Sequence, residues 1–356
     1  MDDLIFTPTR FGALTLANRI VMSPMTRSRA GAGDAPTTMN AAYYRQRASA
    51  GLLVTEGVFP CPEGKGYWRT PGIHSQQQID GWAQVAEAVH AEGGLISMQL
   101  MHCGRAVATA NRGYEADVVA PSALPCPDPI PGPDGVPVPA AMPRALAADE
   151  LPLVAEQHAQ AARNARAAGI DAVELHCSSG YLINSFLNPA SNKREDAFGG
   201  SPENRARFPI MVVKAMAEAV GADRVGVRIS PGNPYNGMDP TDPGPVFAAL
   251  LDGIDDLGLA YLHVLDTYRP GFDTIAFVRR HWSGPVAINN MLTLDKARAL
   301  LAGGQVEGVS FGRAFIGNPD LVARFRAGAP LAEARQEHFY TGEEVGYTDY
   351  PPFTAA

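Results

Sequence analysis

The chain has few features that point to secretion, to a membrane or to nucleic acid. Its 356 residues include only four cysteines, with no CxxC pair and no disulfide-like spacing, so reduced thiols are expected. No stretch approaches the roughly 18 apolar residues of a membrane span, and residues 1–20 lack the apolar core of a signal peptide. No run of Lys or Arg is present and the net charge is −8, which argues against nucleic-acid and anionic-membrane partners. We therefore expect a soluble cytoplasmic protein.

Short apolar runs, each bounded by turn residues, recur along the chain. They are nearly continuous in apolar character, which is typical of parallel strands buried on both faces. The eight candidate strands cover residues 19–22, 51–55, 95–100, 172–175, 225–229, 261–265, 286–288 and 309–311. Apolar residues at helical spacing lie between them at 76–92, 149–168, 204–220, 245–257 and 293–302. Repetition of strand and helix predicts an α/β fold, a closed (β/α)8 TIM barrel.

A doubly wound open sheet is the alternative architecture. The chain lacks a GxGxxG motif directly after its first strand, which is the usual dinucleotide signature of such sheets. Three segments lie outside the repeat: an N-terminal hairpin at about 5–18 that could close the barrel floor, a Pro- and Gly-rich excursion at about 121–143 from the third unit, and a Tyr- and Gly-rich tail at 329–356. We expect residues 1–356 to form a single domain.

Polar residues follow the last two predicted strands. Asn290 comes after the seventh strand, and Gly312 and Arg313 come after the eighth. TIM barrels often bind a phosphate between these loops, chiefly through backbone N–H groups. Asn tolerates left-handed backbone, Gly allows close approach, and Arg can donate two parallel hydrogen bonds to phosphate. The pattern predicts a phosphate site, whose phosphate belongs either to a substrate or to a cofactor.

Arg228 in the fifth strand and Gln99 in the third favour a flavin as that cofactor. A flavin needs a cation near its N1–C2=O edge to stabilise the reduced anion, and it needs amide-type partners along its pyrimidine rim. The alternative is a buried Arg that pairs with a carboxylate such as Glu174.

His176 and Tyr181 follow the fourth strand. A His can donate a hydrogen bond to a carbonyl oxygen and so polarise an enone, and a Tyr with a pKa near 10 suits donation of a proton to the α-carbon. A purely structural, hydrogen-bonded His176 is the alternative. The remaining histidines show no HExxH motif or clustered spacing, so we predict no catalytic metal.

Together these residues resemble the old yellow enzyme family of FMN-dependent ene-reductases. The resemblance covers nearly the whole chain and rests on ordered segments that include LANRIVMSPMTRSRA, LLVTEG, MQLMHCGR, DAVELHCSSGYLINSFLNPASNKREDAFGG, VGVRISP, FGRAFIGNPDL and FYTGEEVGYTDYP. Thr26 resembles the branch typified by pentaerythritol tetranitrate reductase, not the branch that carries Cys there. The resemblance implies tightly bound, non-covalent FMN, NAD(P)H as hydride donor, and a monomer or homodimer.

The resemblance also implies roles for individual residues. His176 would bind the substrate carbonyl and Tyr181 would donate the proton. The residues implied to surround the substrate further include Tyr67, Met101, Ser179 and Tyr340. Those implied to bind FMN are Pro24, Met25, Thr26, Gly57, Gln99, His176, Arg228, Asn290, Met291, Leu292, Gly312 and Arg313.

Three positions depart from the family pattern. Ser179 stands where Asn or His completes a two-donor clamp on the substrate, and Met101 stands where Trp is common, which should enlarge and soften one pocket wall. Asn290 stands where Gly or Ala is frequent near the phosphate. Despite Asn290, the flavin-binding set is intact, whereas the substrate clamp is altered.

The expected activity is reduction of the C=C bond of an α,β-unsaturated carbonyl compound with NAD(P)H, by a ping-pong mechanism. Two alternatives stay open. A flavoenzyme of the same fold could reduce nitrate esters or nitroaromatics, or isomerise a double bond in biosynthesis. A flavin-free barrel lyase or isomerase could instead hold its substrate by the phosphate site.

Overall fold

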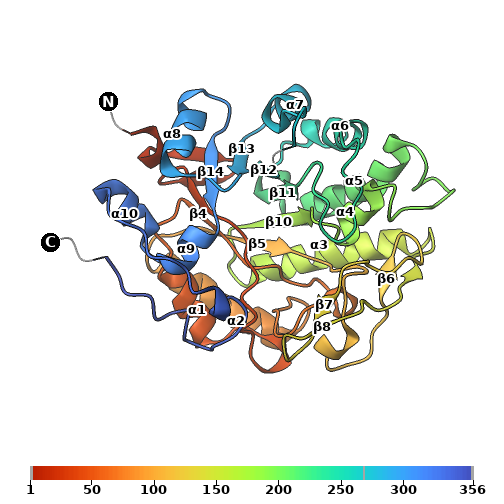
Figure 1. Ribbon diagram of the computed structural model, residues 1–356, viewed down its shortest axis with the longest axis horizontal. Helices are drawn as coiled ribbons and strands as arrows, with labels where there is room; N and C mark the ends of the chain where they lie inside the picture. The colour runs from red at the N-terminus through yellow and green to blue at the C-terminus, as the bar shows by residue number, and fades with distance from the viewer. Residues whose placement is uncertain (1–2, 268, 354–356) are drawn as a thin grey trace.

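A computed structural model describes residues 3–267 and 269–353, which are built around a closed barrel of eight parallel strands (Figure 1). Each strand pairs in parallel with its two neighbours. In barrel order the strands are β3 (Ile20–Met22), β4 (Leu52–Val54), β5 (Ile96–Leu100), β10 (Ala172–Cys177), β11 (Val225–Ile229), β12 (Tyr261–Leu265), β13 (Val286–Asn289) and β14 (Gly308–Phe311). The predicted (β/α)8 barrel is confirmed, because all eight predicted strands are present.

Helices surround the barrel and shield its outer face (Figure 1). Their bounds are α1 (Thr38–Arg45), α2 (Gln76–His90), α3 (Leu151–Ala167), α4 (Leu182–Leu187), α5 (Pro202–Val220), α6 (Gly244–Asp252), α7 (Thr274–His281), α8 (Leu294–Ala302), α9 (Arg313–Gly317) and α10 (Leu321–Ala327). Within the described ranges, none of the helices is long and apolar enough to cross a membrane.

Capping residues account for where two predicted helices begin. Ser201 accepts a hydrogen bond from the Asn204 N–H at 3.2 Å, and Pro202 occupies the first helical position, so α5 starts earlier than predicted. Thr293 caps α8 in the same way. The helix predicted at 245–257 is shorter, because α6 stops at Asp252, beside Gly253, and only one 3-10 turn follows. The helices that the sequence did not reveal have at most eight residues each, too few for a clear helical period.

The N-terminal hairpin closes the floor of the barrel, as expected. Strands β1 (Thr9–Phe11) and β2 (Leu14–Leu16) pair antiparallel. The Phe11 ring stacks on that of Tyr261 with the ring centroids 5.3 Å apart, and Ala172, Ala260 and Ala287 belong to the same apolar cluster. This packing seals the N-terminal end of the strands, so the chemistry has to take place at the opposite end.

The excursion after β5 is longer than the predicted 121–143. It leaves the barrel at Met101 and returns at α3, and it holds two small sheets: β6 (Val119–Ala120) with β9 (Arg144–Ala145), and β7 (Ile130–Pro131) with β8 (Pro137–Val138). Its own apolar cluster includes Met101, Cys103, Val107, Ile130 and Tyr181. The excursion therefore packs directly behind a predicted catalytic residue.

A buried histidine on α3 gives the fold a testable pH dependence. The His158 side chain is inaccessible to solvent, burial lowers its pKa to about 4, and its Nδ1–H donates to the Val154 carbonyl oxygen at 2.8 Å. An unfolded His titrates near pH 6.5, so between these values the unfolded state binds a proton that the folded state does not. This contribution to stability is present above pH 6.5 and is lost as pH falls.

We expect the wild type to lose about 1.4 kcal/mol of unfolding free energy per pH unit below about pH 6.5, relative to His158→Gln. Urea unfolding of both proteins at about pH 7.5 and about pH 5.5 measures the difference. The Gln variant is the matched control, because its amide can donate to the same carbonyl and does not titrate. An identical pH dependence in both proteins would show that His158 is not held neutral.

Candidate active site

The strand register places the predicted polar residues at one end of the barrel. Along β10, Glu174 lies opposite Gln99 of β5, and His176 lies opposite Arg228 of β11. Arg228 lies in turn opposite His263 of β12. These side chains therefore project from neighbouring strands into the mouth of the barrel.

One part of the site is a buried network centred on Glu174. Its two carboxylate oxygens accept hydrogen bonds from Gln99 Nε2 at 2.7 Å and from His263 Nδ1 at 2.8 Å. Arg228 Nη1 donates to His263 Nε2 at 2.7 Å, and Arg228 Nη2 lies 3.5 Å from Asn289 Oδ1. The described contacts include no direct Arg228–Glu174 ion pair; instead the His263 ring contacts both residues, and Arg228 Nη1 also lies 3.0 Å from His263 Nδ1.

Charges in this network are settled by their mutual contacts. Burial alone would raise the pKa of Glu174, but His263 and Arg228 hold it below its usual range. Burial and the neighbouring Arg228 lower the pKa of His263 despite the carboxylate, so the ring is neutral. The network thus contains one anion and one cation.

His176 lies above this network with a defined tautomer. Its Nδ1 accepts the Ser178 backbone N–H at 3.3 Å and lies 3.3 Å from the Ser178 hydroxyl. Burial, and then Arg228, lower the pKa of His176 to about 3. A neutral imidazole that accepts at Nδ1 carries its proton on Nε2. In the described part of the chain Nε2 has no hydrogen-bond partner, which leaves a free donor.

Ser179 is held in a left-handed backbone conformation, with φ of 57°. Its N–H donates to Ser230 Oγ at 3.1 Å, its carbonyl accepts from Asn236 at 2.8 Å, and its hydroxyl accepts from Asn233 Nδ2 at 3.3 Å. Three residues of the β11–α6 loop therefore fix a residue whose conformation is uncommon for a side-chain-bearing residue. The side-chain amide of Asn233, from the loop after β11, thus contacts the position where the family pattern has its own Asn or His.

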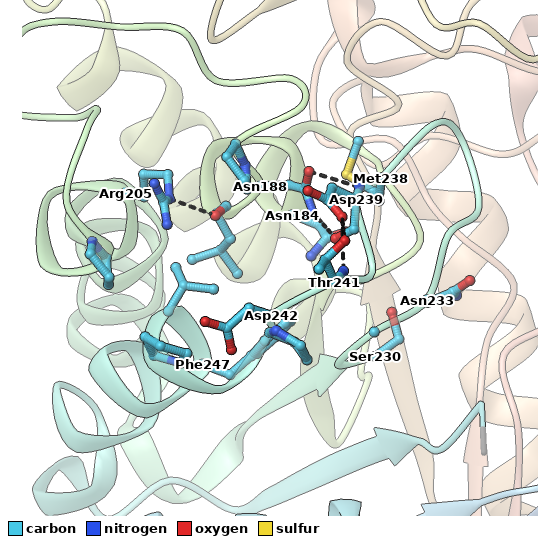
Figure 2. Close-up of a pocket in the computed structure, with 17 residues that line it drawn as sticks. Asn184, Asn188, Arg205, Ser230, Asn233, Met238, Asp239, Thr241, Asp242 and Phe247 are labelled. Atoms are coloured by element: carbon cyan, nitrogen blue, oxygen red, sulfur yellow. Dashed lines mark hydrogen bonds between the residues drawn. The ribbon is translucent and has the colours of Figure 1, made fainter. Parts of the chain in front are cut away.

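That loop also separates the site from a second cavity, of about 350 Å³, between α4, α5 and α6 (Figure 2). Ser230, Asn233, Arg205 and Asp242 all line this cavity. The Arg205 side chain donates to the Leu187 carbonyl at 3.0 Å. This second cavity therefore adjoins the predicted site, because Ser230 and Asn233 both line it and contact Ser179.

Tyr181 lies at the start of α4 and faces both His176 and Tyr67. Its ring is perpendicular to the His176 ring at a centroid distance of 4.9 Å, and its hydroxyl lies 3.0 Å from the Tyr67 hydroxyl. Burial raises the pKa of Tyr181 well above its usual value. The phenol therefore keeps its proton at neutral pH, as a proton donor must.

A cavity of about 430 Å³ opens above these residues. Four predicted site residues contribute to its wall: Thr26, Tyr67, Tyr181 and Tyr340. Trp68 and Tyr235 add exposed aromatic surface to it. His176, Met101 and Ser179 are not among the residues that line it. Met101 packs against Gly57, where a Cβ on Gly57 would come within 2.5 Å of Met101 Cε.

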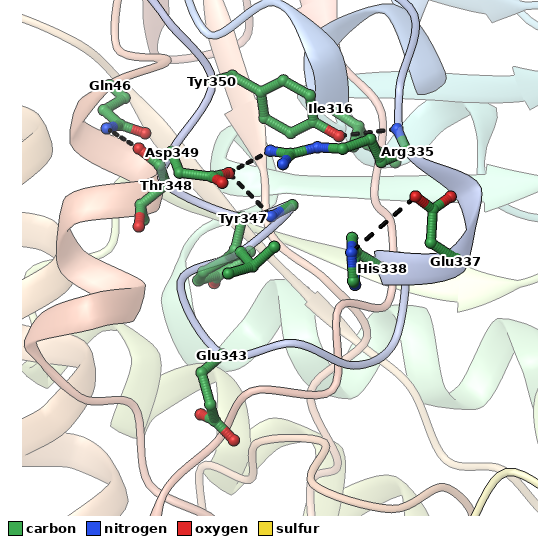
Figure 3. Close-up of polar contacts among 12 residues, drawn as sticks. Gln46, Ile316, Arg335, Glu337, His338, Glu343, Tyr347, Thr348, Asp349 and Tyr350 are labelled. Atoms are coloured by element: carbon green, nitrogen blue, oxygen red, sulfur yellow. Dashed lines mark hydrogen bonds and ion pairs between the residues drawn. The ribbon is translucent and has the colours of Figure 1, made fainter.

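The C-terminal tail forms the outer wall of this cavity through Glu337, Tyr340 and Glu343. Arg69, from the loop after β4, forms an ion pair with Glu343 across the cavity rim. Figure 3 shows how the tail folds back on itself: the Asp349 carboxylate accepts from the Arg335 side chain and from the Gly346 N–H.

Buried guanidinium groups hold the tail on the barrel. Arg27 donates to the Gly346 carbonyl at 2.7 Å and Arg29 donates to the His338 carbonyl at 2.8 Å. The Tyr347 ring stacks on that of Tyr43 of α1 at 4.1 Å, so the blue tail in Figure 1 runs beside the orange-red α1. The position of Tyr340 is thus determined by contacts at both ends of the tail.

The predicted phosphate residues meet at the ends of β13 and β14. Asn290 donates through its side chain to Asp266 at 2.8 Å, and Met291 has a left-handed φ of 38° and a side chain that is 90% exposed. Leu292 is half-buried, and a Cβ on Gly312 would lie 3.4 Å from Met25 Sδ. Arg313 is exposed and forms no hydrogen bond or ion pair with any described residue.

These residues fit FMN. The exposed Arg313 guanidinium suits a phosphate, Pro24, Met25 and Thr26 are half-buried between the phosphate corner and the cavity, and Arg228 supplies a cation at the barrel mouth. Gln99 directs its N–H to Glu174, which leaves its carbonyl oxygen to accept a flavin N–H. The donors and acceptors of these residues are therefore of the kinds that the polar edge of a flavin requires.

The sequence did not reveal several residues that shape this site. Ser178, which fixes the His176 tautomer, adjoins Ser179 but carried no signal of its own. Asn233, His263 and Tyr235 reach the site only through strand register and loop folding. Glu174 was noted only as an ion-pair partner for Arg228; its position two residues before His176 on the same buried strand was the available signal.

Comparisons with known proteins agree with this geometry. The model of the NADH:flavin oxidoreductase / NADH oxidase family matches residues 4–332. The chain is 36% identical to a probable flavin mononucleotide-dependent alkene reductase of Leishmania infantum, covering 98% of this chain and 97% of that protein. It is 38% identical to 12-oxophytodienoate reductase 7 of Oryza sativa subsp. japonica, covering 98% and 94%.

Solved structures give the same result. The old yellow enzyme homologue of Zymomonas mobilis superposes with a TM-score of 0.94 at 39% identity, over 98% of this chain and 99% of that one. Morphinone reductase in complex with tetrahydroNAD superposes with a TM-score of 0.93 at 42% identity, over 98% of each chain. This chain therefore belongs to the NADH:flavin oxidoreductase / NADH oxidase family, among the old yellow enzymes.

Proposed function

We propose that this protein is an FMN-dependent ene-reductase that reduces the C=C bond of α,β-unsaturated carbonyl compounds with NAD(P)H. The observation that carries the proposal is the pairing of a free His176 Nε2–H donor with a protonated Tyr181, with their rings 4.9 Å apart beside the cavity. Family membership and the alkene-reductase and oxophytodienoate-reductase relatives support it.

Each residue has one role in this proposal. FMN, when bound, would supply the hydride chemistry that links NAD(P)H to the β-carbon of the substrate. His176 donates its Nε2–H to the carbonyl oxygen and stabilises the charge that develops there. Tyr181 gives its proton to the α-carbon, and Tyr67, 3.0 Å away and in the wall of the open cavity, provides a route for its replacement. Ser179 positions the carbonyl with the help of Asn233.

The FMN itself would be held at both ends. Arg313, Gly312 and the backbone of residues 290–292 hold the phosphate, and Arg228 and Gln99 meet the pyrimidine edge. Pro24, Met25, Thr26 and Gly57 complete the cradle. The oligomeric state, monomer or homodimer, and the cytoplasmic location stay predictions.

A substrate panel tests the proposal. Cyclohexenone, a nitrate ester and a nitroaromatic compound are supplied with NADPH to the purified protein, and products are identified together with NADPH consumption. The proposal predicts cyclohexanone in a 1:1 ratio to oxidised NADPH. Turnover of the nitrate ester or nitroaromatic compound without any enone reduction would contradict it and would favour the first alternative.

Replacement of Arg313 by Ala is expected to weaken FMN binding. A charge-assisted hydrogen bond contributes about 1.5–3 kcal/mol, so the dissociation constant should rise about tenfold to a hundredfold. The fold should be unaffected, because Arg313 has no partner among the described residues. Fluorescence titration of the apoprotein with FMN measures the constant, and Arg326→Ala, outside the site, is the control. Equal affinities for Arg313→Ala and wild type would place the phosphate elsewhere.

A further inference from the structure

The Glu174–His263 pair is fully buried at the bottom of the barrel mouth, and the proposed mechanism gives it no role. Two charged groups and an imidazole in a barrel interior are expensive to bury unless each is fully partnered. Here they are partnered, with five contacts of 2.7 to 3.0 Å among Gln99, Glu174, His263, Arg228 and Ser310. The His263 ring contacts both Glu174 and Arg228.

The chemistry of each contact fixes a direction. An ionised carboxylate only accepts, so both Gln99 Nε2 and His263 Nδ1 must donate to Glu174. A guanidinium only donates, so His263 Nε2 must accept from Arg228. Glu174 therefore turns the Gln99 carbonyl oxygen away from itself, and through His263 it holds Nη1 of Arg228, while Nη2 lies 3.5 Å from Asn289 Oδ1.

Building on the proposed FMN site, we propose that Glu174 is a positioning residue that orients both Gln99 and Arg228 toward the flavin pyrimidine edge and sets its reduction potential by opposing the Arg228 charge. Gln99 then accepts the flavin N–H, and Arg228 faces the N1–C2=O edge. The Glu174 carboxylate and the Arg228 guanidinium both contact the His263 ring, so the anion moderates the cation without a direct ion pair between them.

The sign of the electrostatic effect follows from charge. Reduced flavin is anionic at N1, so a negative charge below Arg228 disfavours the reduced form. Glu174→Gln removes that charge and also frees Gln99 to turn. We expect the ratio of the dissociation constants of oxidised and reduced FMN to rise about tenfold, which is an upward shift of about 30 mV in the two-electron potential.

The experiment measures the midpoint potential by dye-coupled anaerobic titration and the dissociation constant of oxidised FMN by fluorescence. Glu174→Asp keeps the charge and should stay near the wild-type potential. His158→Gln is the control: it changes a buried, neutral side chain of α3 that donates to the Val154 carbonyl outside this network, so the potential should stay unchanged. An unchanged potential in Glu174→Gln, or an equal shift in Glu174→Asp, overturns the inference.

If Glu174→Gln does not fold, a second pair of variants tests whether Glu174 acts on Arg228 through His263. His263→Gln can still donate to Glu174 and accept from Arg228, whereas His263→Leu can do neither. We expect about tenfold weaker binding of oxidised FMN in the Leu variant and near-wild-type binding in the Gln variant. Equal losses of FMN binding in both variants overturn the inference that Glu174 acts on Arg228 through His263. Wild-type protein that binds no FMN overturns the proposed function itself, which is a distinct outcome.

Discussion

Tyr181→Phe is expected to lower the rate of enone reduction by about a hundredfold to ten-thousandfold, the usual contribution of a positioned general acid. Phe keeps the ring, which packs against His176 and belongs to the apolar cluster with Met101 and Cys103. Only the hydroxyl group and its proton are lost. Flavin reduction by NADPH needs no proton from this residue and should proceed at the wild-type rate.

Stopped-flow mixing separates these two steps: NADPH with the oxidised enzyme, and cyclohexenone with the reduced enzyme. Tyr114→Phe is the control, because it removes a hydroxyl that donates to the Pro62 carbonyl and does not line this cavity, and its effect should be much smaller. Since burial raises the pKa of Tyr181 well above its usual value, the enone step should be independent of pH through the neutral range. A wild-type enone rate in Tyr181→Phe would refute its role as proton donor.

His176→Phe is expected to lower kcat/KM for the enone by about a hundredfold to a thousandfold, the usual loss when one donor to a developing oxyanion is removed. Ser178→Ala should have a smaller effect, because the backbone N–H that also contacts Nδ1 remains. Steady-state kinetics with cyclohexenone measures both losses.

The pH dependence of ketone binding provides a further test of the His176 role. Burial and Arg228 place the pKa of His176 at about 3, far below the ordinary value, so the ring is neutral at every pH above about 4. Binding of cyclohexanone, followed by the flavin absorbance change, should therefore be constant from about pH 5 to about pH 8. A transition near pH 6.5 would indicate that the donor is an exposed imidazolium instead.

The sequence revealed the barrel because its signal is local and repeated. Each strand is a short apolar run, and the positions of Gln99, His176 and Arg228 at strand ends follow from the chain alone. What the sequence did not reveal depends on contacts between distant segments. Helices α1, α4 and α7 are too short to show a clear period, and the excursion after β5 is wider than its Pro-rich centre suggested.

The same division applies to the site. Family resemblance named residues that touch FMN or substrate, and the structure brings most of them to one mouth of the barrel. It did not indicate that Met101 lies behind Gly57, or that Asn233 supports Ser179 from another strand. It could not indicate that His263 contacts both Glu174 and Arg228, because that relation depends on the register of β10, β11 and β12. Such contacts join residues far apart in the chain and leave no spacing pattern.

The visible absorption spectrum of the purified protein under anaerobic conditions tests the proposed activity most directly. We predict a yellow protein that loses its colour with one equivalent of NADPH and regains it when cyclohexenone is added, with cyclohexanone as the product. A protein that loses its colour with NADPH but stays reduced in the presence of cyclohexenone, and regains colour only with a nitrate ester or nitroaromatic compound, would contradict the ene-reductase proposal.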